Sequence, residues 1–187
     1  MDELSLYVLD ITMNSVRAGA TEITIILRED GEWLWFTVVD NGCGMSAEQV
    51  KKLTDPSFTT RKPRKVGLGV PFLTMLAEMT GGYVTVKSAP EELFPETHGT
   101  TIEANFGKNH IDFIPLGDIV ETVKTLIQGA PDVDFIFRHI FPTGKVELNC
   151  AELREMLGEG IPLSEPDILL WIGQYLSEQY DEVRHAG

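Results

Sequence analysis

The chain has 187 residues, of which 43% are apolar and 24% are charged, so we expect one globular domain with an appendage, or two small domains. Asp and Glu outnumber Lys and Arg by 29 to 15, and this acidic balance argues against nucleic acid as a partner. The two cysteines, Cys43 and Cys150, form neither a disulfide framework nor a metal-binding spacing. The apolar run Ile168 to Ile172 is far shorter than the ~20 residues that span a bilayer. We therefore expect a cytoplasmic protein with no export leader and no membrane partner.

Helical spacing predicts a first helix from about Glu3 to Ala18, with an apolar stripe formed by Leu6, Leu9, Met13 and Val16. Asp10 and Asn14 are four residues apart and share a face beside this stripe, with Arg17 about one turn further on. In isolation, these polar residues are typical of the solvated face of a surface helix.

A hairpin follows this helix. Ile23, Ile25 and Leu27 alternate with Glu22, Thr24 and Arg28, and Asp30-Gly31 forms a tight-turn dipeptide. The next strand, Trp33 to Val39, is apolar on both faces and is predicted to be buried, with Trp33 and Trp35 in the core. This strand delivers Asp40 to the edge of the sheet as a fixed hydrogen-bond acceptor.

Two glycines follow Asp40 directly, at positions 42 and 44. Without a Cβ they allow positive φ and let a flat ligand approach the backbone. The turn therefore suits a planar base with an exocyclic amine. Beyond it, Ser46 is expected to cap a short helix over Ala47 to Leu53.

A cationic loop separates this turn from a second glycine pair. Four of the nine Lys and Arg residues in positions 1 to 106 lie between Arg61 and Lys65, which favours an anionic ligand over a merely solvated charge run. Gly67-Leu68-Gly69-Val70-Pro71 then opens a helix with a predicted apolar stripe of Phe72, Met75, Leu76 and Met79. Free N–H groups at such a helix start favour phosphate, and the sequence lacks the Walker spacing of P-loop proteins.

Further strands are predicted at Tyr83 to Lys87 and Thr100 to Phe106. The C-terminal segment is predicted to be folded and holds no recognisable site. Its expected elements are a helix within 115–127, a strand pair at 133–141 and 145–148, and helices at 151–157 and 166–180. His139 is interpreted as a strand residue, not a ligand.

Five segments occur in an order that resembles the GHKL ATPases, the group that holds gyrase, heat-shock chaperones, histidine kinases and MutL proteins. They are Asp10-Ile-Thr-Met-Asn14, Val39-Asp40-Asn41-Gly42-Cys43-Gly44-Met45, Asp55-Pro-Ser-Phe58-Thr-Thr-Arg61, Gly67-Leu-Gly69 and Gly99-Thr100-Thr101. The resemblance covers about residues 1–106 and implies an α/β two-layer sandwich, the Bergerat ATP-binding fold, with residues 107–187 as a small α+β accessory segment.

The resemblance also implies roles for single residues. Asp40 would receive the adenine amine and Thr100 would support it, while Asn14 would coordinate Mg²⁺ on the triphosphate. Asp10 stands where the family often has a catalytic Glu, with one methylene less of reach. The remaining residues expected to bind ATP are Arg17, Gly42, Gly44, Met45, Phe58, Thr59, Thr60, Arg61, Lys62, Arg64, Lys65, Gly67, Leu68, Gly69 and Val70, in part from a lid over the phosphates.

Three functions remain open. The first is a stand-alone histidine-kinase-like domain that phosphorylates a separate protein, because none of His98, His110, His139 and His185 has the setting of a phosphoacceptor. The second is a MutL-like ATP-driven switch that dimerises, and the third is a nucleotide-sensing pseudo-enzyme. Kinase domains of the family carry a strand and a helix before the asparagine helix, whereas about nine residues precede Asp10 here. We expect the C-terminal segment to cover that side of the sheet, as a completing layer or a dimer contact.

Overall fold

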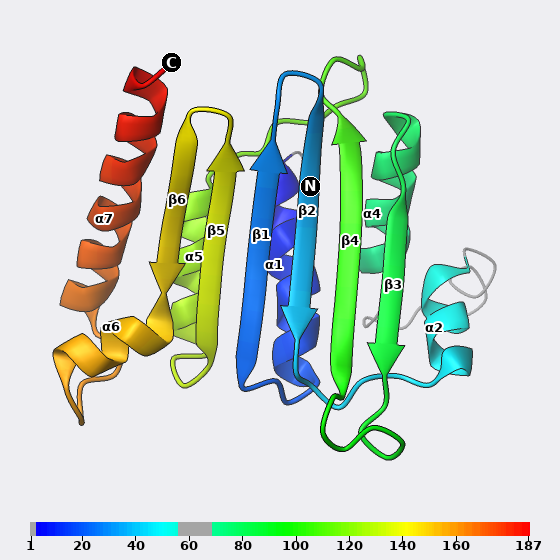
Figure 1. Ribbon diagram of the computed structural model, residues 1–187, viewed down its shortest axis with the longest axis horizontal. Coiled ribbons are helices and arrows are strands. Elements are labelled where there is room, and N and C mark those ends of the chain that lie inside the picture. Colours follow the sequence, from blue (N-terminus) through cyan, green and yellow to red (C-terminus); the bar gives the residue numbers. More distant parts are fainter. Residues whose placement is uncertain (1–2, 56–68) are drawn as a thin grey trace.

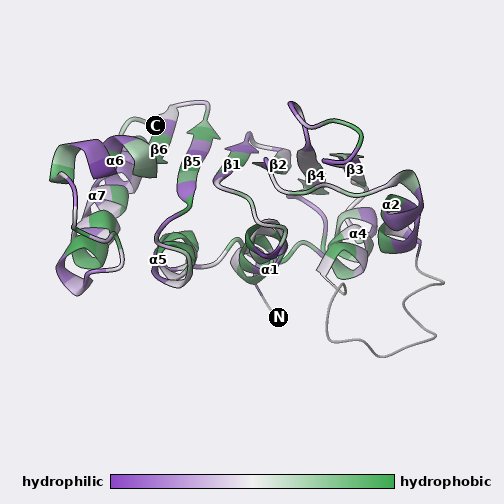
Figure 2. Cartoon of the chain, turned by 90° about the horizontal axis from the view of Figure 1, so that it is seen from below, coloured by the Kyte–Doolittle hydropathy of each residue, from purple (hydrophilic) through white to green (hydrophobic). Residues whose placement is uncertain are grey.

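The computed structural model describes residues 3–55 and 69–187, which form a mixed six-stranded sheet of order β3-β4-β2-β1-β5-β6 (Figure 1). The elements are α1 (Leu4–Arg17), β1 (Glu22–Glu29), β2 (Trp33–Asp40), α2 (Ala47–Thr54), α4 (Gly69–Met79), β3 (Val84–Ala89), β4 (Gly99–Gly107), α5 (Ile119–Gly129), β5 (Asp134–Phe141), β6 (Gly144–Asn149), α6 (Cys150–Leu157) and α7 (Pro166–His185). Figure 2 shows α5, α1 and α4 in a row along one face of the sheet. The predicted two-layer α/β sandwich is confirmed. None of the helices that the structure describes is long and apolar enough to cross a membrane.

The hairpin forms as predicted, with β1 and β2 antiparallel. Alternate residues of β2, Leu34, Phe36 and Val38, are at most 2% exposed and face the helices. The prediction that Trp33 and Trp35 belong to the core is wrong, because both lie on the opposite face and are only partly buried. There the guanidinium of Arg28 lies 3.9 Å from the centre of the Trp35 ring.

The predicted apolar stripe of α4 is also wrong. Phe72, Met75 and Met79 are each more than 40% exposed, and the buried residues are instead Gly69, Val70, Leu73 and Ala77. Both sets repeat at helical spacing, so periodicity alone does not separate them. The close approach of Gly69 to α1 selects the face with the smaller side chains.

The first helix shows the same difference. Leu6 is 39% exposed, while Leu9, Met13 and Val16 are only partly buried against the core. The buried side of α1 combines apolar residues with small hydroxyl residues: Leu4, Ser5, Tyr7, Val8, Ile11, Thr12 and Ser15. An apolar count misses this side because three of its members are polar.

The C-terminal segment continues the sheet. β5 pairs with β1 in parallel, so that Leu27 lies opposite His139, and β6 pairs with β5 in an antiparallel hairpin. α5 packs beside α1 on the helical face, and the buried residues of both parts form one hydrophobic cluster. The predicted helices and strands of this segment are confirmed. The division into residues 1–106 and 107–187 stays a prediction, and in space the two parts share one sheet and one core.

Candidate functional site

The carboxylate of Asp40 lies at the end of β2 and is half-buried. Its Oδ2 accepts a 2.5 Å hydrogen bond from the Ser15 hydroxyl on α1. Its Oδ1 accepts bonds from the backbone N–H groups of Gly42, at 2.9 Å, and Thr100, at 3.2 Å. All three donors are neutral. They fix the position of the carboxylate, and being neutral they do not compensate its negative charge.

Gly42 and Gly44 are required in the turn for different structural reasons. Gly44 has a φ of 68°, as expected, and a Cβ there would collide with the backbone carbonyl of Ala89. Gly42 does not have a positive φ, but its Cβ would lie 2.9 Å from the Cβ of Ala18. Close packing against the end of α1 and the start of the β3–β4 connection therefore excludes a side chain at Gly42 and at Gly44.

The end of β3, the start of β4 and the loop between them anchor the turn from the other side. The backbone N–H of Met45 donates to Ser88 Oγ at 2.7 Å, and that hydroxyl also lies 2.7 Å from Thr100 Oγ1. His98 Nδ1 lies 2.6 Å from the carbonyl oxygen of Gly42, and since a carbonyl only accepts, this nitrogen carries the proton. Thr100 thus supports Asp40 through its backbone, while its side chain bonds to Ser88.

Ser15 and Ser88 are the residues of this site that the sequence did not reveal. Each makes its contact across 25 or more positions of the chain, through a hydroxyl with no motif around it. His98 was expected near the site because it directly precedes Gly99-Thr100, and its bond to Gly42 places it there.

The helix α1 links this turn to the start of α4. The space a Cβ would need at Gly69 is occupied by Asp10 Oδ2, so Asp10 and Gly69 are in contact as the order of the motifs suggests. Asn14 Oδ1 accepts a 2.9 Å bond from Nη1 of Arg17, which is exposed. Val70 is fully buried, so its side chain belongs to the core.

A cation at Asn14 would meet a chemically suitable donor. Mg²⁺ usually takes one or two oxygen ligands from the protein and completes its octahedron with phosphates and water. A neutral amide oxygen, with the Asp10 carboxylate on the same face, matches that pattern, provided that Arg17 shares or releases Oδ1. Elsewhere in the described ranges no group of three or more His, Cys, Asp or Glu side chains could hold a metal.

The residues expected to form a lid lie outside the described residues. Phe58, Thr59, Thr60, Arg61, Lys62, Arg64, Lys65, Gly67 and Leu68 all lie in the range 56–68, and their contacts with phosphate stay predictions.

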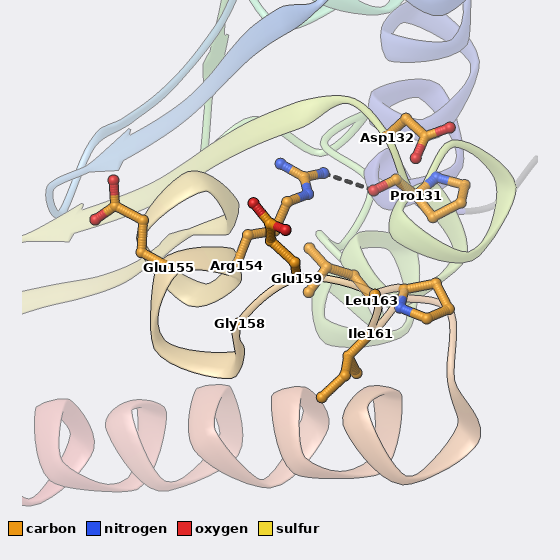
Figure 3. Close-up of a pocket in the computed structure, with 10 residues that line it drawn as sticks. Pro131, Asp132, Arg154, Glu155, Gly158, Glu159, Ile161 and Leu163 are labelled. Carbon is orange, nitrogen blue, oxygen red and sulfur yellow. Dashed lines mark hydrogen bonds between the residues drawn. The ribbon is translucent and has the colours of Figure 1, made fainter.

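A cavity of about 590 Å³ beside α6 is a weaker candidate (Figure 3). Its cation, Arg154, contacts Asp134 and donates to the carbonyl oxygens of Pro131, at 2.5 Å, and Val133, at 2.8 Å. These bonds occupy the guanidinium within the protein, so Arg154 ties α6 to the start of β5 and has little capacity left for a ligand.

The sequence of the chain is similar to that of several known proteins. A family model described as histidine kinase-, DNA gyrase B-, and HSP90-like ATPase matches residues 2–110. The sensor histidine kinase ZraS of Klebsiella oxytoca is 36% identical over 92 residues, which are 48% of this chain and 20% of that protein. The DNA mismatch repair protein MutL of Beijerinckia indica is 30% identical over 110 residues, 58% of this chain and 17% of that protein. The chain thus spans about a fifth of the length of these curated relatives.

Solved structures share the fold beyond residue 110. The Aquifex aeolicus MutL ATPase domain complexed with ADP aligns with a TM-score of 0.50 at 16% identity, over 84% of this chain and 68% of that one. The N-terminal domain of a DNA repair protein aligns with a TM-score of 0.52 at 16% identity, over 80% of this chain and 52% of that one. Since the family model covers residues 2–110, more than half of the sequence, the chain belongs to the histidine kinase-, DNA gyrase B- and HSP90-like ATPases.

Proposed function

We propose that the chain binds ATP and ADP at the turn that follows β2, with Asp40 as the acceptor of the adenine amine. The observation that carries this proposal is the Asp40 carboxylate, which three neutral donors hold in place without neutralising it. An amine donor from a ligand completes such a group, whereas the carbonyl at the same position of guanine offers no proton. Adenine nucleotides therefore bind more tightly than guanine nucleotides.

The contact between Asp10 and Gly69 supports the placement of the triphosphate beside α1 and α4. Asn14 would hold Mg²⁺, which when bound neutralises phosphate charge and orients the terminal phosphoryl group. Asp10 would accept the proton of the attacking water or acceptor group. The lid residues from Phe58 to Lys65, with Gly67, Leu68 and the backbone of Gly69 and Val70, would close over the phosphates.

The γ-phosphate is transferred to a separate protein, as by a stand-alone histidine-kinase-like domain. The sequence likeness to sensor histidine kinases supports this, as do the settings of two of the four histidines: His139 is 1% exposed and His98 is bonded to Gly42. The second candidate, a nucleotide-driven switch that forms a homodimer, is supported by the sequence likeness to MutL. The acidic balance makes a protein, and not a nucleic acid, the expected partner. The two unpaired thiols favour the cytoplasm.

Incubation of the purified chain with γ-labelled ATP and Mg²⁺ separates these functions. The kinase predicts no stable acid-labile label on the chain itself and transfer to a protein added from the same cells. The switch predicts nucleotide-dependent dimers and slow phosphate release, and the phosphate release is lost in Asp10→Ala. The matched control is Asp167→Ala, an exposed carboxylate in the first turn of α7. Stoichiometric phosphohistidine on the pure chain contradicts transfer to a separate protein, and binding with neither transfer nor hydrolysis leaves a nucleotide sensor.

A further inference from the structure

A cavity of about 610 Å³ lies at the opposite end of the sheet from Asp40. It is formed where β1 and β5 end, between the start of α5 and the C-terminal part of α7; Figure 1 shows these parts together, away from the end of β2. Its volume lies within the range of small-molecule sites. Carboxyl ends of neighbouring parallel strands are a common place for such sites in α/β sheets. The proposed nucleotide site does not extend to this cavity.

Three side chains form a connected polar floor. Glu29 Oε2 lies 2.8 Å from His139 Nε2, and His139 Nδ1 lies 2.7 Å from the Tyr180 hydroxyl. Lys108, which follows β4, donates to the other carboxylate oxygen of Glu29 at 3.1 Å. His139 is 1% exposed and Tyr180 is 8% exposed, so this network is built into the fold.

The hydrogen bonds determine what the floor offers a ligand. The ionised Glu29 only accepts, so the Nε2 of His139 carries a proton, and the other ring nitrogen, Nδ1, shares a hydrogen bond with the Tyr180 hydroxyl. Burial raises the pKa of Tyr180 above its usual value, so the phenol stays neutral. The Tyr180 oxygen keeps a free lone pair whichever group donates in its hydrogen bond with Nδ1. The floor therefore offers a ligand a hydrogen-bond acceptor.

The charged side chains around the cavity also favour a cationic ligand over an anionic one. Its lining holds three carboxylates, from Glu29, Asp118 and Asp181, but a single permanent cation, Arg184, which pairs with Asp181 at 3.8 Å. At the start of α5, Asp118 already caps the N–H of Glu121, so a carboxylate occupies the place where a helix start would attract an anion. An anionic ligand is therefore disfavoured.

The walls of the cavity are apolar and partly aromatic. They include Leu116, Ile119, Val120, Phe141 and Val183. The rings of Phe141 and Tyr180 meet edge to face at 6.2 Å, and Phe141 also stacks on His139 at 4.1 Å. Aromatic faces beside acceptors attract organic cations, because the ring quadrupole and the lone pairs both favour positive charge.

We propose that this cavity is a second ligand site, which takes a small organic cation with an apolar body and an ammonium group. The ammonium group donates to the Tyr180 oxygen and faces Asp118, and the apolar body lies against Phe141 and Val120. The net charge of −14 raises the local concentration of such ligands.

The test uses two probes of the same size on the full chain, phenethylammonium and 3-phenylpropionate, followed by calorimetry and by NMR shift mapping. Phenethylammonium is expected to bind saturably, with shifts around α5 and the end of α7, and to bind at least about tenfold more tightly than 3-phenylpropionate. Equal binding of the two probes, or no saturable binding of the cation at high millimolar concentration, overturns the proposal.

Matched variants distinguish specific binding in the cavity from nonspecific electrostatic attraction of the cation to an acidic protein. Tyr180→Phe removes the acceptor, and Asp118→Asn removes a charge while keeping a residue type that caps helices. Each is expected to weaken phenethylammonium about threefold to tenfold. The controls are Tyr175→Phe, on the same helix but outside the cavity lining, and Asp167→Asn; both should bind like the parent. Equal weakening in the controls overturns the proposal.

Discussion

Two carboxylates at opposite ends of the sheet have contrasting surroundings. Asp40, at the end of β2, accepts hydrogen bonds from a hydroxyl and two backbone N–H groups. Glu29, at the end of β1, is held by the ammonium group of Lys108 and the imidazole of His139. Burial opposes ionisation of Glu29, but these two partners outweigh it and lower the pKa of its carboxyl below the usual value.

The difference separates a carboxylate that holds the fold together from one positioned for a ligand. Partners that carry or can acquire positive charge compensate Glu29, so that it joins β1 to β5 and α7. Neutral donors orient Asp40 but do not compensate its charge. Substitutions around Glu29 should therefore change the free energy of unfolding, while substitutions around Asp40 should mainly change nucleotide affinity.

The largest expected effect on stability is that of His139→Ala. It leaves the Tyr180 hydroxyl without its partner, removes one of the two partners of Glu29 and opens a void behind Phe141. We expect the free energy of unfolding, measured by urea denaturation, to fall by about 3 kcal/mol or more. Nucleotide affinity should stay unchanged.

The control for this substitution is His110→Ala, in which the lost side chain is 43% exposed and lies in the loop after β4. It should change stability by no more than about 0.5 kcal/mol. A loss of nucleotide affinity in His139→Ala, without a loss of stability, would contradict the division between the two ends.

A smaller loss is expected from Gly44→Ala. Alanine is strained at a φ of 68°, and its Cβ would collide with the Ala89 carbonyl. The strain should lower the free energy of unfolding by about 1–3 kcal/mol and displace the turn, so that ATP affinity falls as well. Gly129→Ala is the matched control: nothing lies within 4 Å of its Cβ position, and its φ is not positive. Full ATP affinity in Gly44→Ala would show that the turn does not position the base.

Ser15→Ala tests the hydroxyl that reaches Asp40 from α1. The change removes one of three donors and should weaken ATP binding by about 1 kcal/mol, roughly a factor of five. Ser5→Ala, on the same helix, should leave affinity at the parent value, because its hydroxyl contacts Glu3 at 3.4 Å and not Asp40. Titration calorimetry of the three proteins measures the difference, and identical affinities would remove Ser15 from the site.

The smallest effect concerns pH. Because the pKa of Glu29 is lowered in the folded protein, its contribution to stability is present above its ordinary value of 4.5 and is lost as pH falls through the lowered pKa. Between about pH 5 and pH 3, the parent should therefore lose more free energy of unfolding than Glu29→Gln does. Parallel pH profiles would mean that Lys108 and His139 do not stabilise the ionised form.

Much of the fold could be predicted from local pattern. Periodicity and caps gave the helices and strands, including the Ser46 cap of α2, where the Gln49 N–H donates to Ser46 Oγ and the Ser46 N–H donates to Gln49 Oε1. The burial of Trp33 and Trp35 was mispredicted because the helices cover only one face of the sheet. Which face stays uncovered depends on the whole sheet and is not encoded in the sequence of one strand. The parallel pairing of β1 with β5 joins segments about a hundred residues apart, and no local signal encodes it.

The candidate site was predicted unevenly for a similar reason. Asp40, Gly44, His98 and the contact of Asp10 with Gly69 lie in or beside segments whose order is itself a signal. Ser15 and Ser88 join the site only through tertiary contacts. The C-terminal network was missed because His139, interpreted as an ordinary strand residue, acquires its partners from β1 and α7.

The central claim is that Asp40 binds adenine, and calorimetry of Mg·ATP and Mg·GTP with the parent and Asp40→Asn tests it most directly. The amide is nearly the same size as the carboxylate but loses its charge and half of its acceptor capacity, so ATP affinity should fall by about 2–3 kcal/mol while the chain stays folded. The parent should also bind GTP far more weakly than ATP. Equal affinity of Asp40→Asn and the parent for ATP would contradict the account.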